Sequence, residues 1–89
     1  MFTGIIETVG EVEQIKKEGN NIIFTIKSKI SSELKIDQSL SHDGVCLTVV
    51  EKTESTHSVV AIKETSLKSN VKEWKVGTLI NLELSLIHI

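Results

Sequence analysis

The sequence predicts an all-β protein whose strands close into a six-stranded antiparallel barrel. Apolar side chains recur with a period of two along most of the 89 residues, as expected of strands with one buried face. Six short segments carry this pattern, and no long helical pattern separates them. Closing them into a barrel removes the exposed strand edges that promote aggregation, so we favour a barrel over a two-sheet sandwich.

The first two strands are expected at residues 3–16 and 22–28, joined by the polar turn at 18–21. Gly10 predicts a bend or bulge in the first of them, because glycine inside a strand often marks one. In the second strand, apolar residues at alternate positions around Phe24 form one face. That face is the predicted core side.

The alternation stops at "KISSELKID", which predicts a short helical connector. Ser31 or Ser32 is expected to cap this turn and bring Ile30 and Leu34 to the same side. A short strand, residues 39–42, follows the connector.

The next strand, residues 45–52, follows a turn at Asp43 and Gly44, residues that tolerate the left-handed backbone region. Cys46 and Thr48 share one face of this strand because successive side chains alternate. Turn chemistry requires neither of them, so this face is a candidate site. The opposite face, predicted to be core, carries Val45, Leu47 and Val49.

Residues 57–63 are expected to form a hairpin with the preceding strand, and residues 78–83 form the last strand. Between them, residues 64–77 break the alternation and predict a short helix or coil that ends at a glycine. Trp74 and Val76 are expected to pack against the end of the barrel.

Composition argues for a single small domain and against a nucleic-acid partner. The 12 acidic and 10 basic residues give a net charge of −2, and only three aromatic residues are available for stacking on bases. An oligonucleotide-binding barrel is therefore disfavoured. The single cysteine fits a reducing compartment, and no apolar run is long enough for a membrane span. We expect a cytoplasmic protein without a membrane partner.

Three ordered blocks resemble the alpha-type riboflavin synthase family: "MFTGIIETVG", "SHDGVCLTVV", and "KETSL" followed by "VGTLINLE". The resemblance covers residues 1–83. It implies a Greek-key barrel with short helical connectors that binds 6,7-dimethyl-8-ribityllumazine. In the complete enzymes of the family, two such barrels and a C-terminal helix assemble into a homotrimer, and no metal or cofactor is implied.

Residues 1–83 therefore match the amino-terminal half of such an enzyme. The last six residues, 84–89, read "LSLIHI" and resemble a translated sequencing-adapter sequence, with Leu84 where the family has an arginine. We expect this segment to be a non-native tail. A truncated chain of this kind is expected to be weakly active or inactive alone, and to form a homodimer through its opening segment.

The resemblance implies that two lumazines stack in a cleft between barrels. One loses a proton from its 7-methyl group, and a four-carbon transfer gives riboflavin and a ribitylaminopyrimidine. Holding the rings in register would supply most of the rate. Supporting catalytic roles fall on Phe2, Ser39, Cys46 and Thr48. The expected substrate contacts are Gly4, Ile5, Ile6, Cys46, Leu47, Thr48, Val60, Ala61, Ile62, Lys63, Glu64 and Thr65.

Ordinary structural roles compete with these assignments. A free cysteine such as Cys46 is more often a small buried side chain, Thr48 suits any strand, and Glu64 could cap a helix. His42, beside a turn, is expected to be a surface or turn-stabilising residue rather than an acid or base, and His57, in a polar hairpin, is expected to have no chemical role. A lumazine- or flavin-binding protein without turnover is the alternative function, since it needs the same barrel.

Overall fold

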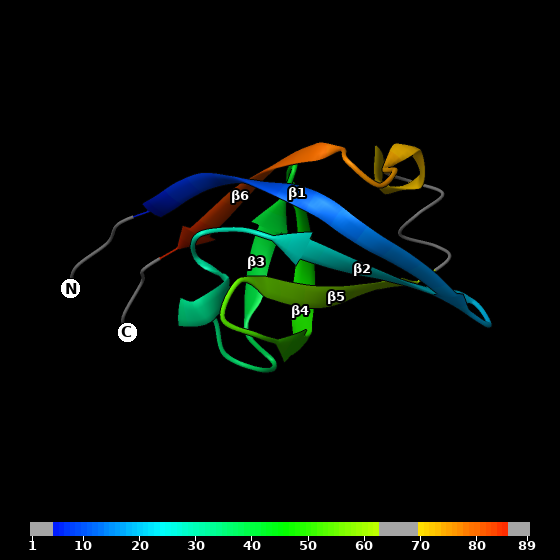
Figure 1. The fold of residues 1–89 in the computed structure, drawn as a ribbon, viewed down its shortest axis with the longest axis horizontal. Coiled ribbons are helices and arrows are strands. Elements are labelled where there is room, and N and C mark those ends of the chain that lie inside the picture. The colour runs from blue at the N-terminus through cyan, green and yellow to red at the C-terminus, as the bar shows by residue number, and fades with distance from the viewer. Residues whose placement is uncertain (1–4, 63–69, 86–89) are drawn as a thin grey trace.

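Six antiparallel strands close into one barrel in the computed structural model of the chain, as the sequence predicts (Figure 1). The structure describes residues 5–62 and 70–85. Around the barrel the order is β1-β2-β5-β4-β3-β6, and the β2 to β5 pairing gives the Greek-key connection. The elements are β1 (Ile5–Glu18), β2 (Asn21–Lys27), η1 (Ser31–Glu33), β3 (Ser39–His42), β4 (Val45–Lys52), β5 (Thr56–Ile62), η2 (Asn70–Glu73) and β6 (Leu79–Ser85).

Within residues 5–62 and 70–85, the helical elements are two short 3-10 turns, η1 and η2. Among the residues that the structure describes, no helix is long and apolar enough to cross a membrane.

Strand bounds differ from the prediction where backbone pairing continues beyond the apolar pattern. β3 and β4 begin and end as predicted, but β1 continues to Glu18, which pairs with Asn21 of β2. β6 continues to Ser85, which pairs with Ile5, and Leu84 within it is buried. The last strand therefore begins one residue later and ends two residues later than the alternation indicated.

β1 is long because its two halves pair with different strands. Residues 5–11 pair with β6 and residues 11–18 pair with β2, so the strand crosses from one side of the barrel to the other (Figure 1). The register with β2 shifts between Val12 and Gln14, which marks a β-bulge. The irregularity lies there rather than at Gly10.

Gly10 has a different role, which is to permit close packing beneath β1. A Cβ atom at this position would lie 2.7 Å from Cγ2 of Ile26 and 2.9 Å from Cδ1 of Leu82. Both distances are too short for a real contact. Glycine therefore lets the strand approach the core side chains of β2 and β6.

The barrel interior is filled by inward-facing side chains and covered at its ends by the 3-10 turns. Phe24 and Trp74 meet edge to face, with ring centroids 5.0 Å apart and planes at 72°. Trp74 is buried as predicted, but Val76 is 66% exposed, so its predicted packing is wrong. The buried hydrophobic residues are Val12, Phe24, Ile26, Ile30, Leu34, Leu40, Leu47, Val49, Val59, Ala61, Val71, Trp74, Ile80, Leu82 and Leu84.

The connector before β3 buries Ile30 and Leu34 on the same side, as predicted. The predicted serine cap is wrong. The N-cap residue of η1 is Ile30, and it makes no side-chain capping hydrogen bond within the described part of the chain. Ser31 is instead buried and hydrogen-bonded inside the barrel, so its hydroxyl is unavailable to the helix end.

The turn between β3 and β4 has the backbone that its residues predict. Asp43 and Gly44 have φ angles of 52° and 85°, as a tight hairpin with two left-handed residues requires. The Asp43 carboxylate accepts a hydrogen bond of 2.7 Å from the backbone N–H of Asn81, and its own N–H donates to the Asn81 carbonyl at 2.8 Å. These bonds fasten the turn to β6.

Candidate functional site

The face of β4 that carries Cys46 and Thr48 points out of the barrel, as the alternation predicts. Both residues are exposed, whereas Leu47 and Val49, at the intervening positions, are 5% and 0% exposed. Inside so small a barrel, a buried thiol or hydroxyl would need a hydrogen-bonding partner. On the outer face, the Cys46 thiol and the Thr48 hydroxyl are instead available at the surface.

β3 adds two more hydroxyls to this face through its register with β4. Ser39 pairs with Thr48, and Ser41 pairs with Cys46. The Ser39 and Thr48 hydroxyl oxygens are 3.3 Å apart and hydrogen-bond across the strands. We call this set of Ser39, Ser41, Cys46 and Thr48 the β3–β4 face. Its hydroxyls both donate and accept, which suits the polar edge of a heterocycle.

Apolar side chains lie beside the β3–β4 face on the neighbouring strand. Val59 of β5 pairs with Val49 of β4, which places Val60 next in line beside Thr48. Val60 is half-buried, and Ile62 further along β5 is 52% exposed. A flat ring with polar edges requires this combination of apolar surface and a few hydrogen-bonding groups.

The structure brings together Ser39, Cys46 and Thr48 of the predicted site. Val60 and Ile62 lie on β5, the strand next to β4. Leu47 and Ala61 face the core, so only their backbone can reach the outer surface. Ile5 and Ile6 lie in β1, which is separated from β3 by β6. Outside the described residues lie Phe2, Gly4, Lys63, Glu64 and Thr65.

The predicted surface position of His42 is wrong, because His42 is fully buried inside the barrel, and so is His57. Their Nε2 atoms are 3.0 Å apart, and their ring centroids are 5.3 Å apart. His42 Nδ1 lies 3.1 Å from the Leu40 carbonyl oxygen, and His57 Nδ1 lies 2.8 Å from the Ser31 hydroxyl. We call His42 and His57 the histidine pair.

These contacts define the direction of every hydrogen bond around the histidine pair. A carbonyl only accepts, so His42 donates from Nδ1 to Leu40, and its Nε2 is the acceptor for the N–H of His57 Nε2. His57 Nδ1 then accepts from the Ser31 hydroxyl, which in turn accepts from Ser28 at 2.7 Å. Both imidazoles are neutral in this arrangement, and all four ring nitrogens are satisfied.

Burial lowers the pKa of each imidazole from 6.5 to about 4, because the charged form loses its hydration. The hydrogen bond to Leu40 partly opposes this shift in the pKa of His42, and repulsion from His42 lowers the pKa of His57 further. The alternation of inward and outward residues along β3 and β5 was sufficient to predict this burial. His42 shares the face of Leu40, and His57 shares the face of Val59, both core residues.

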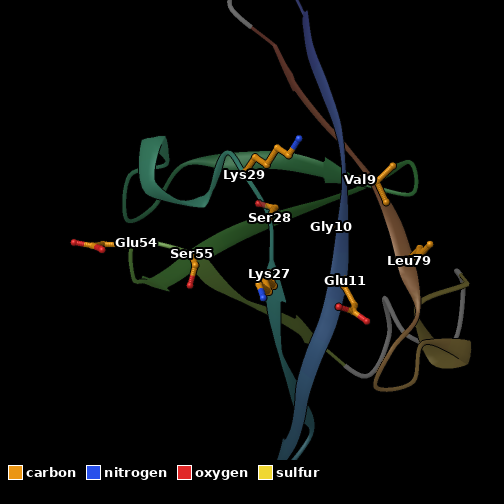
Figure 2. A pocket seen from close by; sticks show the side chains of 9 residues that line it. All are labelled: Val9, Gly10, Glu11, Lys27, Ser28, Lys29, Glu54, Ser55 and Leu79. Atoms are coloured by element: carbon orange, nitrogen blue, oxygen red, sulfur yellow. The ribbon is translucent and has the colours of Figure 1, made fainter.

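A groove of about 470 Å³ lies elsewhere on the barrel, where the first half of β1 has no pairing with β2 (Figure 2). Figure 2 shows Val9 and Leu79 on one side and Glu54 and Ser55 on the other. The groove is lined by both acidic and basic side chains, so it favours neither anions nor cations. Of the predicted site residues that the structure describes, none lines it. The lining residues are Val9, Gly10, Glu11, Lys27, Ser28, Lys29, Glu54, Ser55 and Leu79.

Comparison with known proteins gives one consistent family. The chain matches the lumazine binding domain over residues 3–85. It is 38% identical over 84 residues to riboflavin synthase of Bacillus subtilis, a match that covers 93% of the chain and 39% of that protein. For riboflavin synthase of Saccharomyces cerevisiae the identity is 35% over 91 residues, covering 93% and 38%.

A third relative, riboflavin synthase of Photobacterium phosphoreum, is 33% identical over 89 residues, covering 98% of the chain and 41% of that protein. The chain thus spans about two fifths of the length of the curated relatives it matches. The family match extends from before the described part of β1 to the end of β6 and includes the whole barrel. The chain therefore belongs to the lumazine binding domain family.

Proposed function

We propose that the chain binds 6,7-dimethyl-8-ribityllumazine at the β3–β4 face, as the amino-terminal half of a riboflavin synthase. The observation that carries this proposal is the hydrogen-bonded pair of Ser39 and Thr48 on the outer side of β3 and β4, beside exposed Cys46. Family membership and the names of the curated relatives support the same ligand class.

In the proposed complete reaction, two lumazine molecules meet face to face. A base removes a proton from the 7-methyl group of one molecule, and the resulting carbanion attacks the other. A four-carbon unit is transferred, and riboflavin and a ribitylaminopyrimidine are released. The β3–β4 face would hold one of the two rings by its edges, so that orientation supplies most of the rate.

One barrel provides one such face, so turnover requires a second ligand site on another barrel. We propose that the complete protein is a cytoplasmic homotrimer and that the 89-residue chain alone forms a homodimer with weak activity or none. A purely binding function is less favoured, because the curated relatives that match the chain are named riboflavin synthase.

The site is tested by adding the lumazine to the 15N-labelled chain and following its backbone amide signals. We expect the signals of Ser39, Cys46 and Thr48 to shift. Lys27 and Ser55, which line the groove of Figure 2, are the internal control and should stay unchanged. Shifts confined to the groove, or no shifts at all in a folded chain, would contradict the proposal.

A further inference from the structure

The histidine pair connects two strands that are not neighbours in the barrel. His42 belongs to β3 and His57 to β5, and β4 lies between these strands. The 3.0 Å contact between their Nε2 atoms therefore passes through the interior, beneath the strand that carries Cys46 and Thr48. Side chains rather than backbone hydrogen bonds hold the two flanking strands together at this level.

The hydrogen bonds of the histidine pair continue at one end to the backbone of β3 and at the other end to the connector that contains η1. His42 donates to the Leu40 carbonyl, which lies between Ser39 and Ser41 of the β3–β4 face. At the other end, His57 accepts from Ser31 at the start of η1. A single row of hydrogen bonds thus runs from η1 through β5 to the backbone of the proposed ligand-binding strand.

A first additional proton on His57 Nδ1 requires the Ser31 and Ser28 hydroxyls to reverse, so that Ser31 accepts from the ring and donates to Ser28. It also leaves a charge buried in the barrel with no carboxylate beside it. A second proton puts N–H groups on both Nε2 atoms, which are 3.0 Å apart, so two donors meet. Protonation of both imidazoles must therefore separate the two rings or rearrange the strands that carry them.

No charged group faces the pair from the surrounding elements within the described residues. The buried polar side chains there are Ser31, His42, His57 and Ser58. Trp74, the residue after η2, has its ring centroid 6.4 Å from that of His42. The nearest carboxylate along the chain, Asp43, is occupied by the backbone of Asn81. The remaining charged residues of η1, β4 and η2 are exposed, namely Glu33, Glu51, Lys52, Lys72 and Glu73.

We propose that His42 and His57 are positioning residues that keep β3 and β5 in register beneath β4 while both imidazoles are neutral, and that their protonation loosens the β3–β4 face before the rest of the barrel. The part of this inference that concerns a ligand rests on the proposed function. The structural part stands on the hydrogen bonds of the histidine pair alone.

The first test is the hydrogen position on each ring in the full 89-residue chain, measured from 15N chemical shifts of the imidazoles at pH 7. We expect hydrogen on Nδ1 of His42 and on Nε2 of His57. The opposite form for either ring, or a titration of both rings near the ordinary pKa of 6.5, would overturn the proposal. This test needs no variant and no ligand.

The second test compares amide exchange protection at pH 7 and pH 5. Amides of Leu40, Leu47 and Val59 should lose protection at pH 5 by about tenfold more than those of Thr8 and Gly10, which pair with β6 and are our internal control. The double variant His42→Leu/His57→Leu, which cannot titrate there, should lose this difference. Equal losses at the two sets of amides, or an unchanged difference in the variant, would contradict the proposal.

A second variant covers the case in which the double variant does not fold. Ser31→Ala removes the hydroxyl that hydrogen-bonds to His57 Nδ1 and should shift the pH at which protection is lost. Ser32→Ala, at the exposed neighbouring serine, is the matched control and should leave it unchanged. A midpoint that stays the same in Ser31→Ala would contradict the proposal.

Riboflavin titrations at the same two pH values extend the test to the ligand. Wild-type affinity should weaken by about fivefold or more at pH 5, and that of the double variant by less than about twofold. Equal pH dependence in both chains would contradict a positioning role toward the ligand. A folded chain that binds no flavin at either pH would reject the proposed function, while the exchange measurements would still decide the role of the histidine pair.

Discussion

Nε2 of His42 and Nε2 of His57 lie 3.0 Å apart at the centre of the barrel, and both side chains are fully buried. Burial without a neighbouring carboxylate favours the neutral form of both imidazoles, and one Nε2 then donates to the other. The interior of this barrel therefore contains a polar contact whose hydrogen bonding depends on pH, directly beneath its candidate ligand-binding face.

Folding stability should fall as the pH drops from 6.5 to 4. The pKa of each histidine is about 4 in the folded chain, against 6.5 in the unfolded chain. Above pH 6.5 both states are neutral; between 6.5 and 4 only the unfolded state binds protons, which lowers the free energy of unfolding. The loss approaches roughly 3 kcal/mol for each histidine at pH 4.

Urea unfolding of the wild-type chain and of His42→Leu/His57→Leu at several pH values between 4 and 8 measures this effect. Both proteins contain the same carboxylates, so the difference between their pH profiles isolates the histidines. Parallel profiles over this range would show that the pair does not resist protonation.

Thr48→Val should weaken lumazine or riboflavin binding by about five- to tenfold, because it removes a hydroxyl from the proposed ligand edge, worth about 1 kcal/mol. Fluorescence titration measures the change. The matched control is Thr25→Val, since Thr25 forms a comparable hydroxyl pair with Ser58, at 3.1 Å, on β2 and β5. Equal weakening in both variants would indicate a general effect on the barrel and remove Thr48 from the site.

Gly10→Ala should destabilise the barrel by about 1–3 kcal/mol, because the added methyl group would overlap Ile26 and Leu82. Thermal or urea unfolding measures the loss. Val9→Ala, at the adjacent residue with a 53% exposed side chain, should change stability by less than about 0.5 kcal/mol. A neutral Gly10→Ala would show that β1 can lift away from the core without penalty.

Leu84→Ala should lower the free energy of unfolding by about 2–3 kcal/mol, because Leu84 is 6% exposed and belongs to the core. Leu79→Ala on the same strand, where the side chain is 67% exposed, is the control and should have little effect. The comparison tests whether residue 84, expected from sequence to begin a non-native tail, contributes to the fold. Equal stabilities for the two variants would show that it does not.

The period-two pattern was sufficient to predict the barrel, the bounds of β3 and β4, and the outward direction of Cys46 and Thr48. It did not predict the ends of β1 and β6, because backbone pairing with partner strands continues through residues such as Glu18 and Ser85. Pairing depends on the three-dimensional arrangement and leaves no alternation to detect.

The histidine pair was missed for a different reason. The polar surroundings of His42 and His57 in the sequence favoured exposure, although their positions matched the core residues Leu40 and Val59. A polar side chain is buried when a partner satisfies it, and here the partner is 15 residues away in the chain. Within the candidate site, the contact between Ser39 and Thr48 was likewise not predicted, because it depends on the register of β3 and β4.

The most direct test of the central claim is a fluorescence titration of the 89-residue chain with 6,7-dimethyl-8-ribityllumazine at pH 7.5. We expect saturable binding of about one ligand per barrel, as one β3–β4 face per chain requires. If the dispersion of the amide NMR signals shows that the chain is folded and no saturable binding is seen, the assignment of this face as a lumazine site is contradicted.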